Sequence, residues 1–202
     1  MAAFYTARAV APALPAPLPP LKWVASPNHY RGRSQRLDLV VVHDCEGGYA
    51  GSINWFANPA SRVSAHFVVK EDGSEATQMV DLADAAWHVR QFNGRSIGIE
   101  MAGFAAKGYG SNEWLAMASI VAFHLHHLQL PNKWARAGVG PGFCRHYDLG
   151  KAGGGHTDPT TNDATWAQFC DMVTAAYDHG NFPALWTGEH EGHKACSLGA
   201  RR

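Results

Sequence analysis

Two short segments in the last third of the chain carry side chains suited to metal binding or proton transfer. Residues 153–159 read GGGHTDP, which sets His156 and Asp158 two residues apart behind three glycines. In an extended segment, residues i and i+2 point to the same side, so both side chains can reach one metal ion or one substrate bond. The segment CRHYD adds His146 and Asp148. A catalytic zinc takes three such ligands and keeps a fourth position for water, but spacing alone does not choose among these four residues.

A further candidate, His43, follows a short apolar run. Residues 37–42 read LDLVVV, and this nearly continuous apolar stretch rich in β-branched residues predicts a strand buried on both faces. A polar, glycine-rich turn comes next, and α/β sheets expose ligands and catalytic groups at such strand ends. Position alone supports a hydrogen-bonded core histidine equally well.

The remaining histidines fit a site less well. His124, His126 and His127 lie in a predicted helix, where only the first and last share a face, and we interpret all three as solvated surface residues. Residues 189–193 read EHEGH, with histidines three apart in a glycine-containing tail. The HExxH motif of zinc proteases needs histidines four apart on a helix, so we exclude that motif.

The bulk composition predicts one globular domain without a charged binding surface. The chain has 202 residues, of which 46% are hydrophobic. Its 17 basic and 17 acidic residues cancel, which argues against nucleic acid or an anionic membrane surface as a partner. The four cysteines contain no CxxC pair, which argues against a zinc ribbon or a disulfide framework and leaves a single disulfide open.

The chain divides into three expected parts. Residues 1–36 read as an Ala/Pro-rich arm, 37–180 as the folded domain, and 181–202 as a loosely attached tail. Prolines are dense in the apolar stretch APALPAPLPPL, which argues against a helical signal peptide or membrane span. We therefore expect no transmembrane segment and no ordinary secretion signal.

Strands and helices alternate within the domain. Beyond 37–42, we predict strands over 64–69, 75–80 and 96–101. We predict helices over 52–57, from an N-cap at Ser111 or Asn112 to about residue 128, and from about residue 163 to Gly180. The strand SIGIEM carries Glu100 on the face opposite its isoleucines. This order predicts an α/β fold, a single domain with a mixed central sheet flanked by helices.

Taken in order, these segments resemble the type-2 N-acetylmuramoyl-L-alanine amidases, zinc enzymes that include phage lysins and animal peptidoglycan recognition proteins. The resemblance covers roughly residues 26–178 and rests on LVVVHDCEGG, RVSAHFVVKEDG, AAWHV, FNGRSIGIEM, CRHYD and HTDPT. Each piece is weak alone, but the ordered set is specific. It implies a fold like that of the peptidoglycan recognition proteins and hydrolysis of the amide between N-acetylmuramic acid and the L-alanine of the stem peptide.

The resemblance also implies a role for each site residue. The ligands of one Zn²⁺ per chain would be His43, His146 and Asp158. Glu100 would transfer protons, and His156 would stabilise the developing oxyanion, at a position where the family often has a lysine. The residues lining the substrate groove would be Trp87, His88 and Asn93.

This chain departs from the family pattern in two places. Thr160-Thr161 follows Asp158-Pro159 where a glycine is common, and Val89-Arg90 follows Trp87-His88 where Ala-Gly is common. The second departure is expected to change the groove wall and the peptidoglycan that is accepted. Cys45 and Cys144 each lie two residues from an expected ligand, which leaves them open as adventitious ligands or disulfide partners.

The expected partner is bacterial peptidoglycan or its muropeptides, and we expect a monomer. The protein would be a phage-type endolysin or a wall-remodelling enzyme, made in the cytoplasm, including that of a phage-infected host, and acting on the cell wall. A non-catalytic peptidoglycan-binding protein of the same fold is the alternative. It is disfavoured because all three ligand positions and Glu100 are filled.

Overall fold

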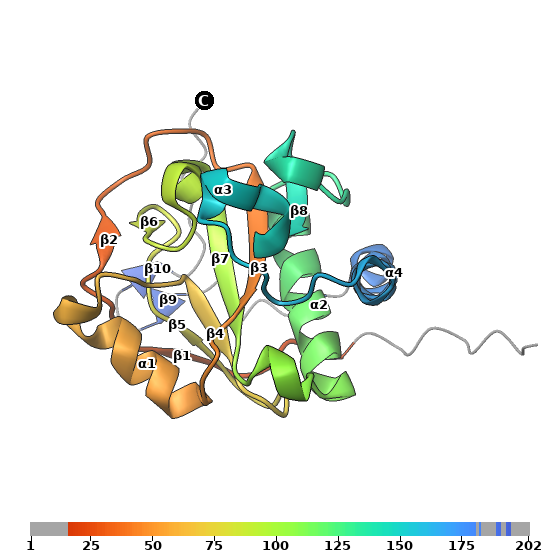
Figure 1. Cartoon of the computed structure of the whole chain (residues 1–202), viewed down its shortest axis with the longest axis horizontal. Helices are drawn as coiled ribbons and strands as arrows, with labels where there is room; N and C mark the ends of the chain where they lie inside the picture. The colour runs from red at the N-terminus through yellow and green to blue at the C-terminus, as the bar shows by residue number, and fades with distance from the viewer. Residues whose placement is uncertain (1–15, 181, 183–188, 191–192, 195–202) are drawn as a thin grey trace, which may run out of the picture.

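The fold is built on a six-stranded sheet with helices on both faces (Figure 1). The computed structural model describes residues 16–180, 182, 189–190 and 193–194. The strands are β1 (Leu21–Trp23), β2 (His29–Tyr30), β3 (Leu39–Asp44), β4 (Phe67–Val69), β5 (Ala76–Gln78), β6 (Ala85–Ala86), β7 (Ser96–Met101), β8 (Gly142–Arg145), β9 (Glu189–His190) and β10 (His193–Lys194). The α-helices are α1 (Tyr49–Ala57), α2 (Ser111–His127), α3 (Gly150–Gly153) and α4 (Asp163–His179).

The sheet is mixed, as predicted. Its order is β1-β5-β4-β7-β3-β8, in which only the β4–β5 pair is antiparallel. Because β3, β7 and β8 run parallel, their carboxyl ends lie at one edge of the sheet. In this register His43 lies beside Glu100.

The two faces of the sheet pack against different elements. The main core joins Val40 and Val42 of β3 to apolar residues of α2 and α4, which cover one face. Leu39 and Val41 point to the other face, where a smaller cluster includes Cys144 and Leu149. His43 follows the same alternation and therefore lies on this second face, away from α2.

The sheet begins earlier than expected. β1 pairs in parallel with β5, and the amide of Asn28 donates to the carbonyls of Phe56, Asn58 and Val63. The expectation that the fold starts after residue 36 is therefore wrong. A three-residue strand at a sheet edge carries too few alternating positions to be recognised by pattern. Residues 1–15 lie outside the described part.

The expected tail over 181–202 also falls mostly outside the described residues. Where the backbone is described, Glu189–His190 and His193–Lys194 form an antiparallel pair. His190 and His193 therefore belong to two strands, so the two histidines are not on one helix as the HExxH motif requires.

The helix predictions are confirmed except at two N-terminal ends, because α1 begins at Tyr49 and not at the predicted Ser52, and α2 has a different N-cap. The side chain of Asn162 caps α4, and Gly180 ends it in the left-handed region at φ 61°. α1 ends just before Asn58-Pro59, as predicted. α2 has Gly110 at its N-cap, without a side-chain cap, in place of Ser111 or Asn112. Among the described residues, no helix has the length and apolarity needed to cross a membrane.

The prediction that the three histidines of α2 are solvated surface residues is wrong for His124. Its side chain is fully buried, with ring centroids 4.9 Å from Phe67 and 5.1 Å from Phe123. The reason is that α2 is covered by the sheet on one side and by α4 on the other. His126 is exposed, as expected.

One buried carboxyl in α2 predicts a pH-dependent stability. Glu113 is 2% exposed, and burial, followed by the charges of Glu71 and Asp44, raises its pKa to about 8. The folded state therefore holds a proton that the unfolded state releases above its own pKa of 4.5, so stability falls as pH rises from 4.5 to about 8. Glu113→Gln should raise the Tm at pH 8 and leave it little changed at pH 4, as measured by circular dichroism.

The matched neutralisation Asp171→Asn, at an exposed position of α4, should not show this trend. A Glu113→Gln effect of equal size at both pH values would contradict the assignment.

Candidate metal centre and active site

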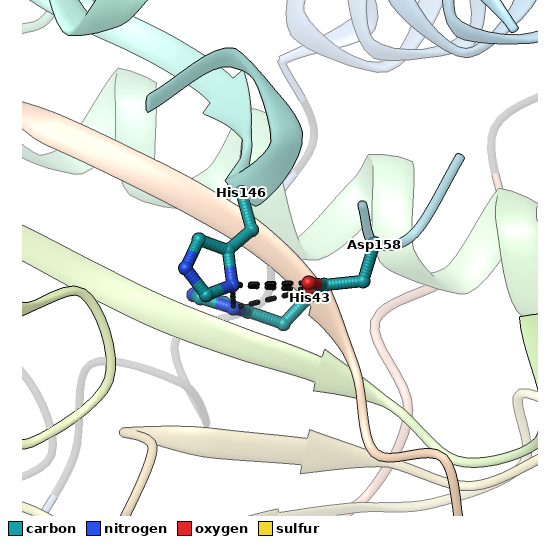
Figure 2. A group of neighbouring side chains, drawn as sticks. All are labelled: His43, His146 and Asp158. Carbon is teal, nitrogen blue, oxygen red and sulfur yellow. Dashed lines mark hydrogen bonds and ion pairs between the residues drawn. The ribbon is translucent and has the colours of Figure 1, made fainter. Parts of the chain in front are cut away.

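Three side chains from separate segments converge on one point (Figure 2). His43 comes from the end of β3, His146 from the turn after β8, and Asp158 from the loop before α4. The Nδ1 atoms of the two histidines lie 3.0 Å apart. Asp158 places Oδ2 at 3.3 Å from the first Nδ1 and Oδ1 at 3.1 Å from the second.

These distances fit a tetrahedral metal ion. Ligand atoms about 2.0–2.1 Å from a tetrahedral zinc are about 3.3 Å apart, close to the separations seen here. All three side chains are largely removed from water, with exposures of 3%, 5% and 13% for His43, His146 and Asp158. The group therefore has the donor set, the spacing and the burial of a three-ligand metal centre.

The hydrogen bond at the far side of His146 sets its tautomer. Its Nε2 lies 3.0 Å from the carbonyl oxygen of Gly153. A carbonyl only accepts, so Nε2 carries the proton and Nδ1 presents a lone pair to the centre. Such an outer bond is what orients a metal-binding histidine.

A longer chain of hydrogen bonds sets the tautomer of His43. The Ser96 hydroxyl donates to the Phe92 carbonyl at 2.8 Å, so its oxygen accepts from Nε2 of His88 at 3.0 Å. Nδ1 of His88 is then an acceptor, and it lies 2.9 Å from Nε2 of His43. His43 donates from Nε2 and points the lone pair of Nδ1 at Asp158 and His146. We call Ser96, His88 and His43 the histidine chain.

A glycine makes room for this chain. A Cβ added to Gly98 on β7 would lie 2.4 Å from Nδ1 of His88. The imidazole therefore rests directly on the strand backbone, which only glycine permits. The Ser-Ile-Gly-Ile-Glu strand thus contributes three things to the site: the Ser96 hydroxyl, the space at Gly98 and the Glu100 carboxyl.

The charges at the centre favour a cation. Burial, followed by the neighbouring His146, lowers the pKa of His43 to about 4, which keeps this ligand neutral. Burial opposes ionisation of Asp158, but the two histidines outweigh it and hold the pKa of that carboxyl well below its usual range. Burial also opposes charging of His146, whose pKa is raised by Asp158.

Glu100 stands beside the centre without a partner for one of its oxygens. It is 7% exposed, and among the described residues its Oε2 has no hydrogen bond. Burial, followed by the charges of Asp158 and Asp44, raises its pKa well above the ordinary value. A carboxylate in this state accepts a proton more readily than one in water.

The two residues of the HTDP segment take different places. Asp158 belongs to the set of candidate metal ligands with His43 and His146, which we call the metal group. The His156 side chain is 62% exposed. The His156 ring stacks on His146 at 4.5 Å, with Nδ1 at 3.8 Å from Oδ1 of Asp158. Asp148 is held elsewhere, because it accepts from Trp134 and pairs with Arg145.

The cysteines next to the ligands do not join the described metal group. Cys45 and Cys144 are free thiols, as is Cys170, while Cys196 lies outside the described residues. Cys45 lines the hollow that contains the metal centre. Cys144 packs with Leu39 and Val41 in the smaller apolar cluster of the sheet.

The three residues expected to line a substrate groove lie together next to the centre. Trp87 and His88 line both the hollow of the metal group and a second, adjoining hollow, and Asn93 lines the second. Trp87 packs on Tyr30 with ring centroids 5.3 Å apart. The Asn93 side chain also accepts from the backbone N–H groups of His88 and Val89, which fixes the turn that carries the groove wall.

Comparison with known families agrees with this geometry. The family model described as N-acetylmuramoyl-L-alanine amidase matches residues 33–161, which include the metal group, Glu100 and His156. The chain belongs to the N-acetylmuramoyl-L-alanine amidase family.

Relatives of this amidase-family chain are found in sequence and in structure. N-acetylmuramoyl-L-alanine amidase A of Achromobacter lyticus is 44% identical over 82 residues, or 41% of this chain. The match spans 46% of that protein, about half its length. Among solved structures, Staphylococcus aureus hydrolase AmiA, in complex with its ligand, is similar with a TM-score of 0.67 at 19% identity, over 83% of this chain and 88% of that one. An AmpD derivative has a TM-score of 0.53 at 28% identity, over 76% of this chain and 94% of that one.

Sequence reasoning placed His88 in the groove but missed its contact with His43. Ser96 was not singled out at all. The available signal was the glycine of the Ser-Ile-Gly-Ile-Glu strand, because a glycine inside a strand often marks the close approach of another group.

The histidine chain predicts an effect on metal affinity in this amidase-family protein. His88→Ala removes the acceptor that orients His43, so affinity for Zn²⁺ should fall by roughly 10–100-fold, as measured by competition with a chromophoric chelator. His88→Asn, whose amide oxygen can replace Nδ1 as the acceptor, should recover part of the loss. The exposed His126→Ala is the matched control. Unchanged affinity in a folded His88→Ala protein would refute the role of the chain.

Proposed function

We propose that this protein is a zinc-dependent amidase that hydrolyses the amide bond between N-acetylmuramic acid and the L-alanine of the peptidoglycan stem peptide. The observation that carries the proposal is the three-ligand group with Glu100 at the end of the adjacent strand. Family membership supports the same activity. The cofactor would be one Zn²⁺ per chain, held by His43, His146 and Asp158.

Amide hydrolysis needs a stronger nucleophile than water and a better leaving group than an amide anion. When bound, zinc supplies a Lewis acid that makes water more acidic and an amide carbonyl more electrophilic. Glu100 then takes the proton of the attacking water at its unpartnered Oε2 and later delivers it to the departing nitrogen of L-alanine. Its raised pKa suits both steps, because the same group must accept and then donate a proton.

His156 acts on the carbonyl side. Its exposed ring stacks on His146, at the opening of the hollow where a substrate enters. A ring N–H donated to the carbonyl oxygen stabilises the negative charge that develops as the tetrahedral intermediate forms. Trp87, His88 and Asn93 form the wall that positions the substrate beside these groups.

The cellular setting follows from the proposed substrate. Bacterial peptidoglycan or its muropeptides would be the partner, and the protein would act on the cell wall as a phage-type endolysin or a wall-remodelling enzyme, as a monomer. A peptidoglycan-binding protein without catalysis is the alternative. It is less well supported, because a binding protein has no need of a buried carboxyl with a raised pKa next to a complete ligand set.

The activity itself is tested on purified peptidoglycan. Zinc-loaded protein should bind one metal ion per chain and release free L-alanine amino termini without new reducing sugar ends. Amine labelling and a reducing-sugar assay measure the two products. Protein that binds the wall and one zinc but liberates no amine would instead support the non-catalytic alternative.

The role of Glu100 is tested by an isosteric change. Glu100→Gln removes the proton acceptor but keeps the size of the side chain, so turnover should fall about 10²–10⁴-fold. Zinc content, measured by atomic absorption, should stay at the wild-type level because the carboxyl is not a ligand. Turnover close to wild type would refute the assignment.

Replacing His146 and replacing His156 should have different effects on zinc content. His146→Ala removes a ligand and should lose zinc and activity together. His156→Ala should keep zinc and lose turnover by about 10²-fold, the usual cost of removing one oxyanion donor. The opposite pattern of metal content would show that the two roles are exchanged.

A further inference from the structure

A cationic hollow adjoins the metal centre. It shares Val63, Trp87, His88 and His156 with the hollow of the metal group, and it continues to Arg62 and Arg90. The residues of the described structure that line it include no aspartate or glutamate. Among the described residues, no ion pair joins either arginine to a carboxylate. Two uncompensated guanidinium groups in one groove favour an anionic ligand.

Arg90 holds an unusual backbone position. Its φ is 53°, in the left-handed region where glycine has no steric cost and an arginine does. Its Nε lies 3.5 Å from the point where a Cβ on Gly154 would be, and the His156 ring lies against the same point. The arginine therefore reaches across the groove to the loop that carries His156 and Asp158. Arg90 also lines a further hollow, together with Arg31 and Gln91. It therefore lies between that hollow and the cationic hollow next to the metal centre.

The chemistry of the proposed substrate indicates which half of the substrate lies in this groove. The only carboxyl of N-acetylmuramic acid is consumed in the scissile amide, so the sugar half carries no charge. The carboxylates all belong to the peptide half, which leaves as the amine. A cationic hollow next to the reaction centre therefore suits the peptide half.

We propose that Arg90 is a specificity-determining residue that binds a carboxylate of the stem peptide on the amine side of the scissile bond. The proposal rests on the proposed amidase function and adds a charge requirement to it. A guanidinium matches a carboxylate in a planar, two-point geometry that a neutral amide does not offer. Either the second or the third residue of the stem can supply this carboxylate.

The test compares pairs of disaccharide-tripeptides that differ at one carboxyl. In one pair the α-carboxyl of the second residue is free or amidated, and in the other the side-chain carboxyl of a diaminopimelate third residue is free or amidated. The preference is the ratio of kcat/KM for the free acid to that for the amide. Wild-type protein should show a preference on the order of tenfold in one pair, which identifies the carboxylate.

Two variants remove the guanidinium without straining the turn. Arg90→Gly suits the left-handed backbone, and Arg90→Asn tolerates it, so both should fold. Both should bring the preference close to one by lowering kcat/KM for the acid while leaving that for the amide nearly unchanged. Arg90→Lys should retain part of the preference, because it keeps the charge and loses the two-point geometry. Arg36→Gly, at an exposed position that lines neither hollow, is the control for net charge.

The outcomes separate the two proposals. Equal cleavage of acid and amide in both pairs by wild-type protein would overturn the role of Arg90 and leave the amidase function standing. A preference that persists in Arg90→Gly and Arg90→Asn would do the same. Absence of amine release from all four substrates by zinc-loaded protein would overturn the amidase function, and the role of Arg90 with it.

Discussion

The convergence of three acceptor atoms on one point is the constraint that the rest of the site serves. With both Nδ1 atoms unprotonated, two imidazole lone pairs face each other at 3.0 Å and a carboxylate at 3.1–3.3 Å. Such an arrangement is repulsive unless a positive charge lies in the middle, either a metal ion or the proton that Asp158 favours on His146, because burial removes the water that would otherwise screen it. Around a metal ion the three groups do not attract one another directly, so other contacts must hold them in place.

The sheet supplies most of that support. Parallel pairing of β3 with β7 and β8 ends three strands at one edge, so that His43, Glu100 and the turn of His146 meet without long connections. Hydrogen bonds on the far side of each histidine then fix which nitrogen carries the proton. Gly98 is the point where backbone and site depend on each other, since a side chain there would displace His88 and release His43. The strand that carries Glu100, the proposed proton acceptor, thus also orients His43, a proposed metal ligand.

The parts predicted from sequence are those governed by local rules. β7 was predicted over its full extent because isoleucines alternate with glycine and glutamate, and α4 because Asn162 and Gly180 are strong end signals. β1 and β2 were missed because pairing with distant partners defines them, and a strand of two or three residues has no readable period. His124 was misplaced because its contact with Phe67 depends on how α2 lies on the sheet, which cannot be read from α2 alone. The choice between Asp148 and Asp158 came from family resemblance, since spacing offered both, and the structure ties Asp148 to Arg145 and Trp134.

The HTDP loop shows how one short segment can carry two opposite environments. Residues i and i+2 of an extended chain share a side, and here the His156 ring and the Asp158 carboxyl do approach within 3.8 Å. They differ in depth, with side-chain exposures of 62% and 13%. A metal ligand gains from burial because water no longer competes for the ion, whereas a group that meets the substrate must stay open to it until the substrate arrives. Stacking on the buried His146 anchors the His156 ring, which still lines the adjoining groove and stays largely exposed.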